Sequence, residues 1–101
     1  MGEEVNLDRL DAELAKVYGY ETPPNWWKPT RDWETAAILL ERFKDWHIFR
    51  DPEAGTKEGE EYFCNFRDAG KFYTTGPQSS VPLAVSLTVA DYYGIDLEEE
   101  T

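Results

Sequence analysis

The stretch PPNWWKPTRDWETAAILLERF, from Pro23 to Phe43, decides the fold of this chain. It holds three of the four tryptophans within eight residues, at Trp26, Trp27 and Trp33. From Trp33 onward the apolar residues recur at helical spacing, which predicts a helix with one buried face. The residues of that face are Trp33, Ala36, Ala37, Leu40 and Phe43.

The part of this stretch that precedes the helix is irregular, because three prolines lie between Tyr20 and Thr30. Large aromatic rings rarely stand free in water, so Trp26 and Trp27 are expected to cover the edge of the core. Rigid aromatic side chains are also efficient anchors for a partner. The pair is therefore a candidate partner-binding site as well as a candidate part of the core.

A second helix-forming stretch, VPLAVSLTVADYYG, runs from Val81 to Gly94, and Pro82 suits its first turn. It is apolar on two sides: Leu83, Ala84, Leu87 and Ala90 form one, and Val81, Val85, Val89 and Tyr92 form another. A helix that covers one face of a sheet needs only a single apolar stripe. Either this helix is enclosed inside the domain, or its second side is an interface that would support a homodimer.

The remaining elements complete an α+β domain. A first helix is predicted from Leu7 to Tyr18, ended by Gly19, and short strands are predicted over 46–50, 60–66 and 71–75. The expected N-caps are Asn6, then Thr30 or Asp32, then Ser79 or Ser80. Asp68, Ala69 and Gly70 are expected to form a three-residue hairpin loop with the glycine in the left-handed conformation.

The element order α-α-β-β-β-α predicts a small antiparallel three-stranded sheet packed with helices. A length of 101 residues is that of one domain, in which we expect the acidic tail 96–101 to be flexible. The second strand is expected to place Tyr62, Cys64 and Phe66 on one face and Phe63 on the other. The residues expected to be mostly buried are Leu10, Leu14, Trp33, Ala37, Leu40, Phe43, Tyr62, Phe66, Leu83 and Leu87.

The charge of the chain restricts its partners. Twenty-one acidic residues against ten basic ones give a formal net charge of -11. Direct binding of nucleic acid is disfavoured, because that needs clustered Lys and Arg, whereas a basic protein surface is a favoured partner. A single cysteine, no signal peptide and no membrane-spanning apolar run predict a cytoplasmic protein that does not bind membranes.

Catalytic chemistry has little support. His47 is the only histidine, and Cys64 shares an apolar strand face with aromatic residues, so both are expected to be structural. No Gly-rich phosphate loop is present, and the acidic residues after Arg50 lack the spacing of a calcium loop. We therefore expect a protein that is not an enzyme and uses no metal and no cofactor.

Two acidic clusters are candidate partner-binding sites besides the tryptophans. Asp51, Glu53, Glu58, Glu60 and Glu61 fall in and beside the polar loop between the first two predicted strands, and Glu98, Glu99 and Glu100 form a run near the end of the chain. Carboxylates on a rigid scaffold speed the encounter with a basic surface. The alternative is that they are solvated charges that keep a small protein soluble.

The motif Trp-Trp-x-Pro-Thr-x-Asp-Trp before an Ala-rich helix, with Pro-Leu-Ala opening a final helix, resembles the phage ABA sandwich domain proteins, which are small bacteriophage proteins. The resemblance covers most of the chain and implies a phage or prophage source. It also implies a sheet sandwiched by helices. Those proteins often carry an Arg after Pro-Leu-Ala-Ile-Cys; here the run is Pro-Leu-Ala-Val-Ser, ending at Ser86, so no role of that Arg carries over.

No activity accompanies this resemblance, so the function is a hypothesis. Small phage proteins without catalytic motifs commonly occupy a host protein. We therefore expect a counter-defence protein, anti-CRISPR-like or a nuclease inhibitor, that blocks a basic nucleic-acid-binding surface in the infected bacterium. One alternative is an oligomeric sponge for a nucleotide immune signal, with a pocket between subunits for which Arg31, Arg42, Trp26 and Trp27 are the available residues. Another is a phage accessory protein with a different role.

Overall fold

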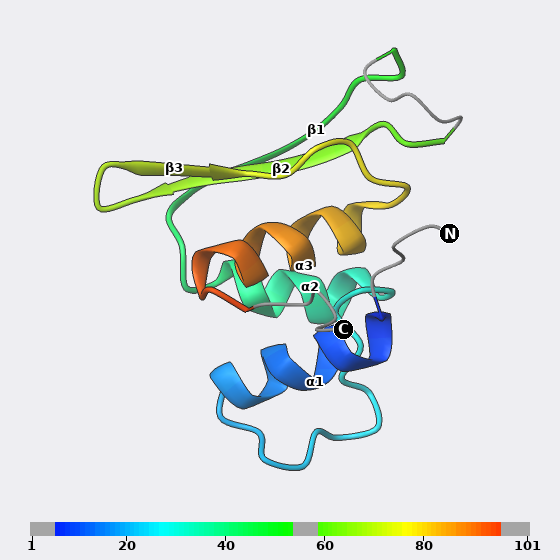
Figure 1. Ribbon diagram of the computed structural model, residues 1–101, viewed down its shortest axis with the longest axis vertical. Helices are drawn as coiled ribbons and strands as arrows, with labels where there is room; N and C mark the ends of the chain where they lie inside the picture. The colour runs from blue at the N-terminus through cyan, green and yellow to red at the C-terminus, as the bar shows by residue number, and fades with distance from the viewer. Residues whose placement is uncertain (1–5, 54–58, 96–101) are drawn as a thin grey trace, which may run out of the picture.

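The structure is a computed structural model that describes residues 6–53 and 59–95 (Figure 1). Its elements follow the predicted order and belong to the α+β class. They are α1 (Leu7–Val17), α2 (Trp33–Leu40), β1 (Asp45–Arg50), β2 (Tyr62–Asp68), β3 (Lys71–Thr74) and α3 (Val81–Tyr92). No helix within the described ranges is long and apolar enough to cross a membrane.

Each helix begins where a local capping signal places it. The side chains of Asn6, Asp32 and Ser80 each accept a hydrogen bond from the backbone N–H three residues later. This interaction satisfies one of the N–H groups that an α-helix leaves unpaired at its start. Of the alternatives left open by the sequence, Asp32 and Ser80 are the caps. Pro82 lies in the first turn of α3, as predicted.

The sheet has the strand order β1-β2-β3, and both strand pairs are antiparallel. The hairpin between β2 and β3 is tighter than predicted. Asp68 pairs with Lys71, so the turn contains only Ala69 and Gly70, and both have positive φ, 53° and 79°. Two left-handed residues in succession are the type I′ geometry that matches the twist of a hairpin. The predicted three-residue loop was wrong. A two-residue turn needs a positive φ at Ala69, and the sequence did not indicate one because alanine seldom adopts that conformation.

All three helices of the described ranges lie on the same side of the sheet (Figure 1). Helix α3 packs against β2 and β3, and α2 and α1 pack against α3. The sandwich that the resemblance implied, with helices on both faces, is therefore not the observed arrangement. The other side of the sheet, which we call the open face, carries alternate residues of the three strands, namely Asp45, His47, Phe49, Phe63, Asn65, Arg67, Phe72 and Thr74.

Helix α3 is enclosed inside the domain, which explains why it is apolar on two sides. Four of its apolar residues are buried: Ala84, Val85, Val89 and Ala90. The Thr88 hydroxyl lies 3.0 Å from the Cys64 carbonyl oxygen and 2.8 Å from the Ala84 carbonyl oxygen. One face of α3 thus meets the sheet and the other meets α2. Leu83 and Leu87 are only partly buried.

The predicted core is confirmed in part. Leu10, Leu14, Leu40, Phe43 and Phe66 are buried, and Ala37 and Tyr62 are partly buried. Trp33 is 45% exposed, so its prediction as a core residue was wrong. The buried stripe of α2 is Thr35, Ala36, Leu39 and Leu40. This stripe is rotated from the predicted one, and the rotation turns the first residue of the helix toward solvent.

Candidate functional site

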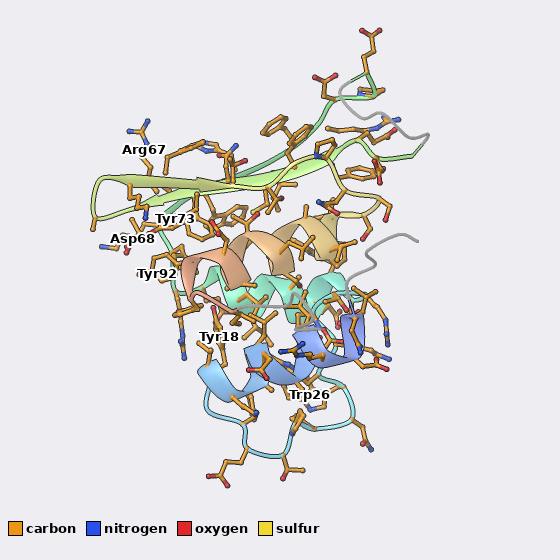
Figure 2. The ribbon with its side chains drawn as sticks, viewed as in Figure 1. Tyr18, Trp26, Arg67, Asp68, Tyr73 and Tyr92 are labelled. Atoms are coloured by element: carbon orange, nitrogen blue, oxygen red, sulfur yellow. The ribbon has the colours of Figure 1, made fainter. Side chains whose placement is uncertain are left out.

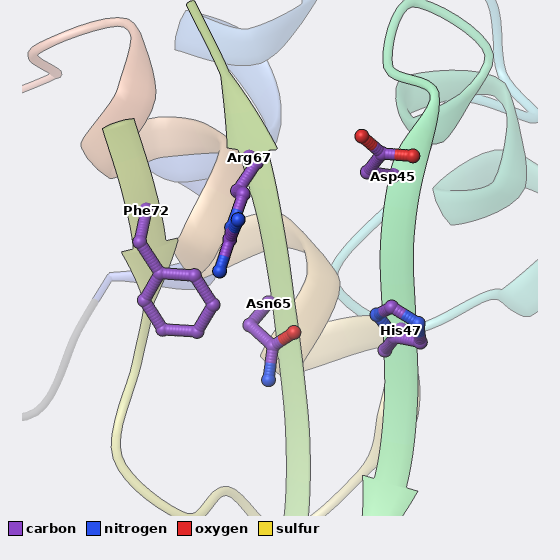
Figure 3. A pocket seen from close by; sticks show the side chains of 5 residues that line it. All are labelled: Asp45, His47, Asn65, Arg67 and Phe72. Atoms are coloured by element: carbon purple, nitrogen blue, oxygen red, sulfur yellow. The ribbon is translucent and has the colours of Figure 1, made fainter. Parts of the chain in front are cut away.

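The open face contains a shallow hollow of about 240 Å³ to which all three strands contribute (Figure 3). Asp45, Arg67 and Phe72 lie side by side in the strand register, and His47 and Asn65 form the next row. Because strand residues alternate between faces, this register brings side chains from distant parts of the chain to one surface. The hollow therefore exists only once the three strands have paired.

Three polar residues of this hollow, Asp45, His47 and Arg67, are exposed, and Asn65 is partly buried. Figure 3 shows the Arg67 side chain extending between Phe72 and Asn65. The Arg67 guanidinium carbon is 6.0 Å from the centroid of the Phe72 ring, and that ring is 54% exposed. No ion pair between described residues involves Asp45 or Arg67. A carboxylate and a guanidinium without an ion-pair partner among the described residues thus share one row with an exposed ring.

An aromatic pair lies beyond the hollow on the same face. The rings of Phe49 and Phe63 are stacked, with centroids 4.8 Å apart and planes 5° apart. Phe49 is 45% exposed. The sequence predicted Phe63 on this face but did not single out Phe49, Arg67 or Phe72. The alternation of side chains along each strand could have assigned these three residues to one face of the sheet, but only if the register between the strands had been known.

The four described residues of the first predicted acidic cluster lie where β1 ends and β2 begins, and we call them the acidic end. They are Asp51, Glu53, Glu60 and Glu61. The Asp51 N–H donates a 2.8 Å hydrogen bond to the Glu61 carbonyl oxygen, which extends the strand pairing past β1. Asp51 and Glu53 are exposed, and Glu60 is partly exposed. The fifth residue, Glu58, and the tail residues Glu98, Glu99 and Glu100 lie outside the described residues.

Glu61 is the one member of the acidic end with a basic partner among the described residues. Its carboxylate accepts a hydrogen bond from the Arg50 guanidinium, and its side chain is only 16% exposed. This carboxylate raises the pKa of the Arg50 guanidinium. The charge of Glu61 is therefore largely neutralised within the domain. Asp51 and Glu53 are the more accessible carboxylates of the predicted cluster.

The opposite end of the sheet carries basic residues. Lys44 precedes β1, Arg67 is near the end of β2, and Lys71 begins β3. All three are exposed. The carboxylate of Asp68 accepts a 2.6 Å hydrogen bond from the Tyr92 hydroxyl on the helix side of the sheet, whereas Arg67 points to the other side (Figure 2). We call this the hairpin end; beside its three basic residues it carries the carboxylates of Asp45 and Asp68.

The two adjacent tryptophans have different environments. Trp27 is buried, with 5% of its surface exposed, and its indole Nε1 donates a 2.8 Å hydrogen bond to the Asp11 carbonyl oxygen. Its prediction as a partner-binding residue was therefore wrong. Trp26, labelled in Figure 2, is half exposed. Its ring lies edge-on to the ring of Tyr20. Only Trp26 of this pair is available to a partner.

The residues predicted for a nucleotide pocket have other roles. Arg31 forms a 2.8 Å ion pair with Asp8. The Arg42 guanidinium carbon lies 3.8 Å from the centroid of the Tyr18 ring, and Arg42 also donates a hydrogen bond to the Tyr93 hydroxyl. Both arginines are engaged at separate places within the domain, and Trp27 is buried. Within one chain these residues do not form a common pocket; the pocket between subunits that the sponge alternative needs stays a prediction.

His47 and Cys64 lie on opposite faces of the sheet. His47 is exposed in the hollow, whereas Cys64 is fully buried against α3. Burial raises the pKa of the Cys64 thiol to about 12, so the reactive thiolate is scarce at neutral pH. In the part of the chain that the structure describes, no three His, Cys, Asp or Glu side chains cluster as metal ligands would. That the protein is not an enzyme stays a prediction.

Comparison with known proteins identifies a fold. No protein-family model and no curated protein matches the sequence. The structure is similar to the 2.0 Å crystal structure of a phage protein from Bacillus cereus ATCC 14579, with a TM-score of 0.62. The match covers 88% of this chain and 93% of that chain at 13% sequence identity. At that identity the likeness shows a shared fold alone.

Proposed function

We propose that this chain is a non-enzymatic accessory protein of a bacteriophage, and that its acidic end binds a basic surface on a host protein. One observation carries the proposal. Asp51 and Glu53 are exposed at one end of a rigid sheet, and the nearby Arg50 is already paired with Glu61. The shared fold with a phage protein supports a phage source.

The chemistry of the target follows from that of the acidic end. Carboxylates fixed on a rigid scaffold can take the places that phosphates occupy on a basic nucleic-acid-binding surface. The whole chain carries a formal net charge of -11, which raises the rate of encounter with a positive partner. The target that fits best is a host defence nuclease or ribonucleoprotein, which this protein would inhibit by blocking the site for DNA or RNA.

A competition assay tests this proposal. Host defence proteins retained by the immobilised chain are purified, loaded with labelled DNA or RNA, and mixed with the free chain. We expect the chain to displace the nucleic acid, with less displacement as salt rises and screens the charges. Bacteria that express the chain should also plate more phage when the corresponding defence system is present.

A pair of charge-reversed variants makes the assay specific. Replacing Asp51 and Glu53 by Lys should slow association by about tenfold or more, which is the scale of electrostatic steering. The matched control replaces Glu21 and Glu41 by Lys; both are exposed, and neither belongs to the acidic end. The control makes the same change in net charge. Equal loss in both variants would show that net charge matters and the acidic end does not.

The absence of catalysis is tested separately. The double variant His47→Gln with Cys64→Ser should displace nucleic acid as well as the wild type does. Circular dichroism is needed beside it, because Cys64 is fully buried and its replacement can perturb the core. A variant that stays folded but loses all displacement would contradict a mechanism that depends on binding alone.

A further inference from the structure

Strand β3 forms one edge of the sheet, and α3 packs against it (Figure 1). In an antiparallel ladder, hydrogen-bonded and non-hydrogen-bonded residue pairs alternate. Asp68 and Lys71 close a two-residue turn and are therefore a hydrogen-bonded pair. The next hydrogen-bonded pair includes Tyr73. The N–H and C=O groups of Phe72 and Thr74, which belong to the intervening pairs, consequently point outward from the edge.

These outward groups lack backbone partners among the described residues. Outside the paired strands, no backbone hydrogen bond of the described chain involves Phe72 or Thr74. The chain leaves β2 after Thr74, and pairing resumes only where Gln78 meets Tyr62. An edge that presents unpaired N–H and C=O groups is a template for another extended strand.

A groove of about 370 Å³ adjoins the end of β3 and one side of α3. Its apolar residues are Leu87, Ala90 and Ile95, and the exposed Asp91 adds a carboxylate. Paired strands alternate together between the two faces of a sheet, so a strand added to β3 sends every second side chain to the helix side. The edge and the groove can therefore bind one segment, the edge through its backbone and the groove through its side chains.

We propose that β3 and this groove bind a short extended segment of a partner protein as a fourth strand of the sheet. The backbone of the segment pairs with Phe72 and Thr74, which is recognition by strand addition. Two of its side chains, two positions apart, enter the groove. One is apolar and packs against Leu87, and the other is basic and lies beside Asp91.

The spacing of the groove matches that of a strand. Leu87 and Asp91 are four residues apart on α3, so their Cβ atoms are separated by about 5–6 Å. Alternate residues of a strand are about 6.8 Å apart and lie on the same face. A segment with an apolar residue, any residue and then Lys or Arg therefore meets both helix residues at once.

Charge selects a basic segment rather than a second copy of this chain. The chain carries a formal net charge of -11, and Asp91 forms no ion pair with a described residue. Pairing two β3 edges would bring two strongly acidic chains together, whereas a basic segment is attracted. The inference does not depend on the proposed function, because the acidic end lies where β1 ends and β2 begins and the groove adjoins β3.

Fluorescence anisotropy of a labelled peptide tests the proposal with the full chain. The probe is Thr-Val-Thr-Lys-Thr with rhodamine at its N-terminus and an amidated C-terminus, titrated with chain up to about millimolar concentration. We expect saturable binding. Replacing the lysine of the peptide by Glu should weaken binding by about tenfold or more. A fully N-methylated peptide keeps the side chains but loses the backbone donors, and it should not bind.

Variants of the chain locate the binding. Asp91→Lys should weaken binding of the lysine peptide by about tenfold or more. The matched control, Glu41→Lys, makes the same change in charge at an exposed residue that does not line the groove, and should weaken binding less. The chain with Asp51 and Glu53 replaced by Lys should still bind the peptide. That result separates this groove from the acidic end.

Amide hydrogen exchange tests the pairing itself. The saturating peptide should slow exchange of the Phe72 and Thr74 amides by about tenfold or more. Ile48 is the matched control at the other edge of the sheet. The Asp51 N–H bonds to the Glu61 carbonyl oxygen, so the same alternation along β1 turns the Ile48 N–H outward. Its exchange should not change.

Four outcomes would overturn the proposal. The first is no saturable binding of the lysine peptide. The second is equal binding of the lysine and glutamate peptides, which would remove the role of Asp91. The third is binding that leaves exchange at Phe72 and Thr74 unchanged, which would place the peptide elsewhere. The fourth is dimerisation in sedimentation equilibrium that protects these two amides without peptide, which would make a second copy the occupant.

Discussion

The indole Nε1 of Trp27 donates a 2.8 Å hydrogen bond to the carbonyl oxygen of Asp11, which joins the loop before α2 to the middle of α1. The carboxylate of the same aspartate accepts hydrogen bonds from the backbone N–H and the hydroxyl of Thr30. The backbone carbonyl and the side-chain carboxylate of Asp11 therefore both bind the loop. This contact explains why a tryptophan in a proline-rich segment belongs to the core.

The buried carboxyl of Asp11 should make stability depend on pH. Burial raises its pKa above the ordinary value. A carboxyl with a raised folded-state pKa binds more protons when folded, so its contribution to stability is greatest below the unfolded-state pKa and falls as pH rises through the folded-state pKa. In the Asp11→Asn variant, the decrease in stability that Asp11 causes as pH rises should be absent. Chemical denaturation from about pH 3 to about pH 7, at roughly unit intervals around the ordinary aspartate pKa, measures the difference; parallel profiles for the two proteins would contradict it.

Two truncations test which face of α2 is buried. Leu39 is fully buried, so Leu39→Ala should lower the free energy of unfolding by about 2–5 kcal/mol. Trp33→Ala removes a larger side chain from a half-exposed site and should cost about 1 kcal/mol or less. Urea denaturation measures both. The reverse ranking would restore the stripe first predicted from the sequence.

Ser86 is expected to be a weak point of the core. Its hydroxyl is fully buried and has no hydrogen-bond partner among the described residues. A buried polar group without a partner is destabilising, so Ser86→Ala should raise the free energy of unfolding by up to about 1 kcal/mol. Thr88→Val is the control on the same helix: it removes a hydroxyl that is bonded to Cys64, and should cost about 1 kcal/mol. A loss of stability in Ser86→Ala would show that its hydroxyl is satisfied.

The hairpin turn offers a stabilising substitution. Ala69 has a φ of 53°, a conformation that costs an alanine roughly 1–2 kcal/mol. Asparagine tolerates this conformation better, and Asn-Gly is favoured in type I′ turns. Ala69→Asn should therefore raise the melting temperature, as scanning calorimetry can measure. Ala12→Asn, in the middle of α1, is the control and should lower it.

Part of the candidate site was predictable. The acidic residues beside the first loop were recognised from the sequence, and Asp51 and Glu53 are exposed as a contact surface requires. The hollow of Asp45, Arg67 and Phe72 was not predicted. Its residues come from three strands, and a shift of one residue in either pairing would send a different set to the open face. Sequence spacing alone does not establish that register.

The sequence by itself determined the α+β class, the order of the elements and the starts of the helices. These features follow from local interactions: capping residues mark each helix start to within a few positions, and apolar periodicity marks the helices themselves, whereas the structure decided that Asp32 and Ser80 are the caps and that α3 is enclosed on two sides. The tertiary structure alone decided the rotation of α2, the burial of Trp27 and the open face. Each of these depends on contacts between segments far apart in the chain. The free energies of such contacts exceed the intrinsic conformational preferences of single residues, and the contacts cannot be recognised from the spacing of neighbouring residues.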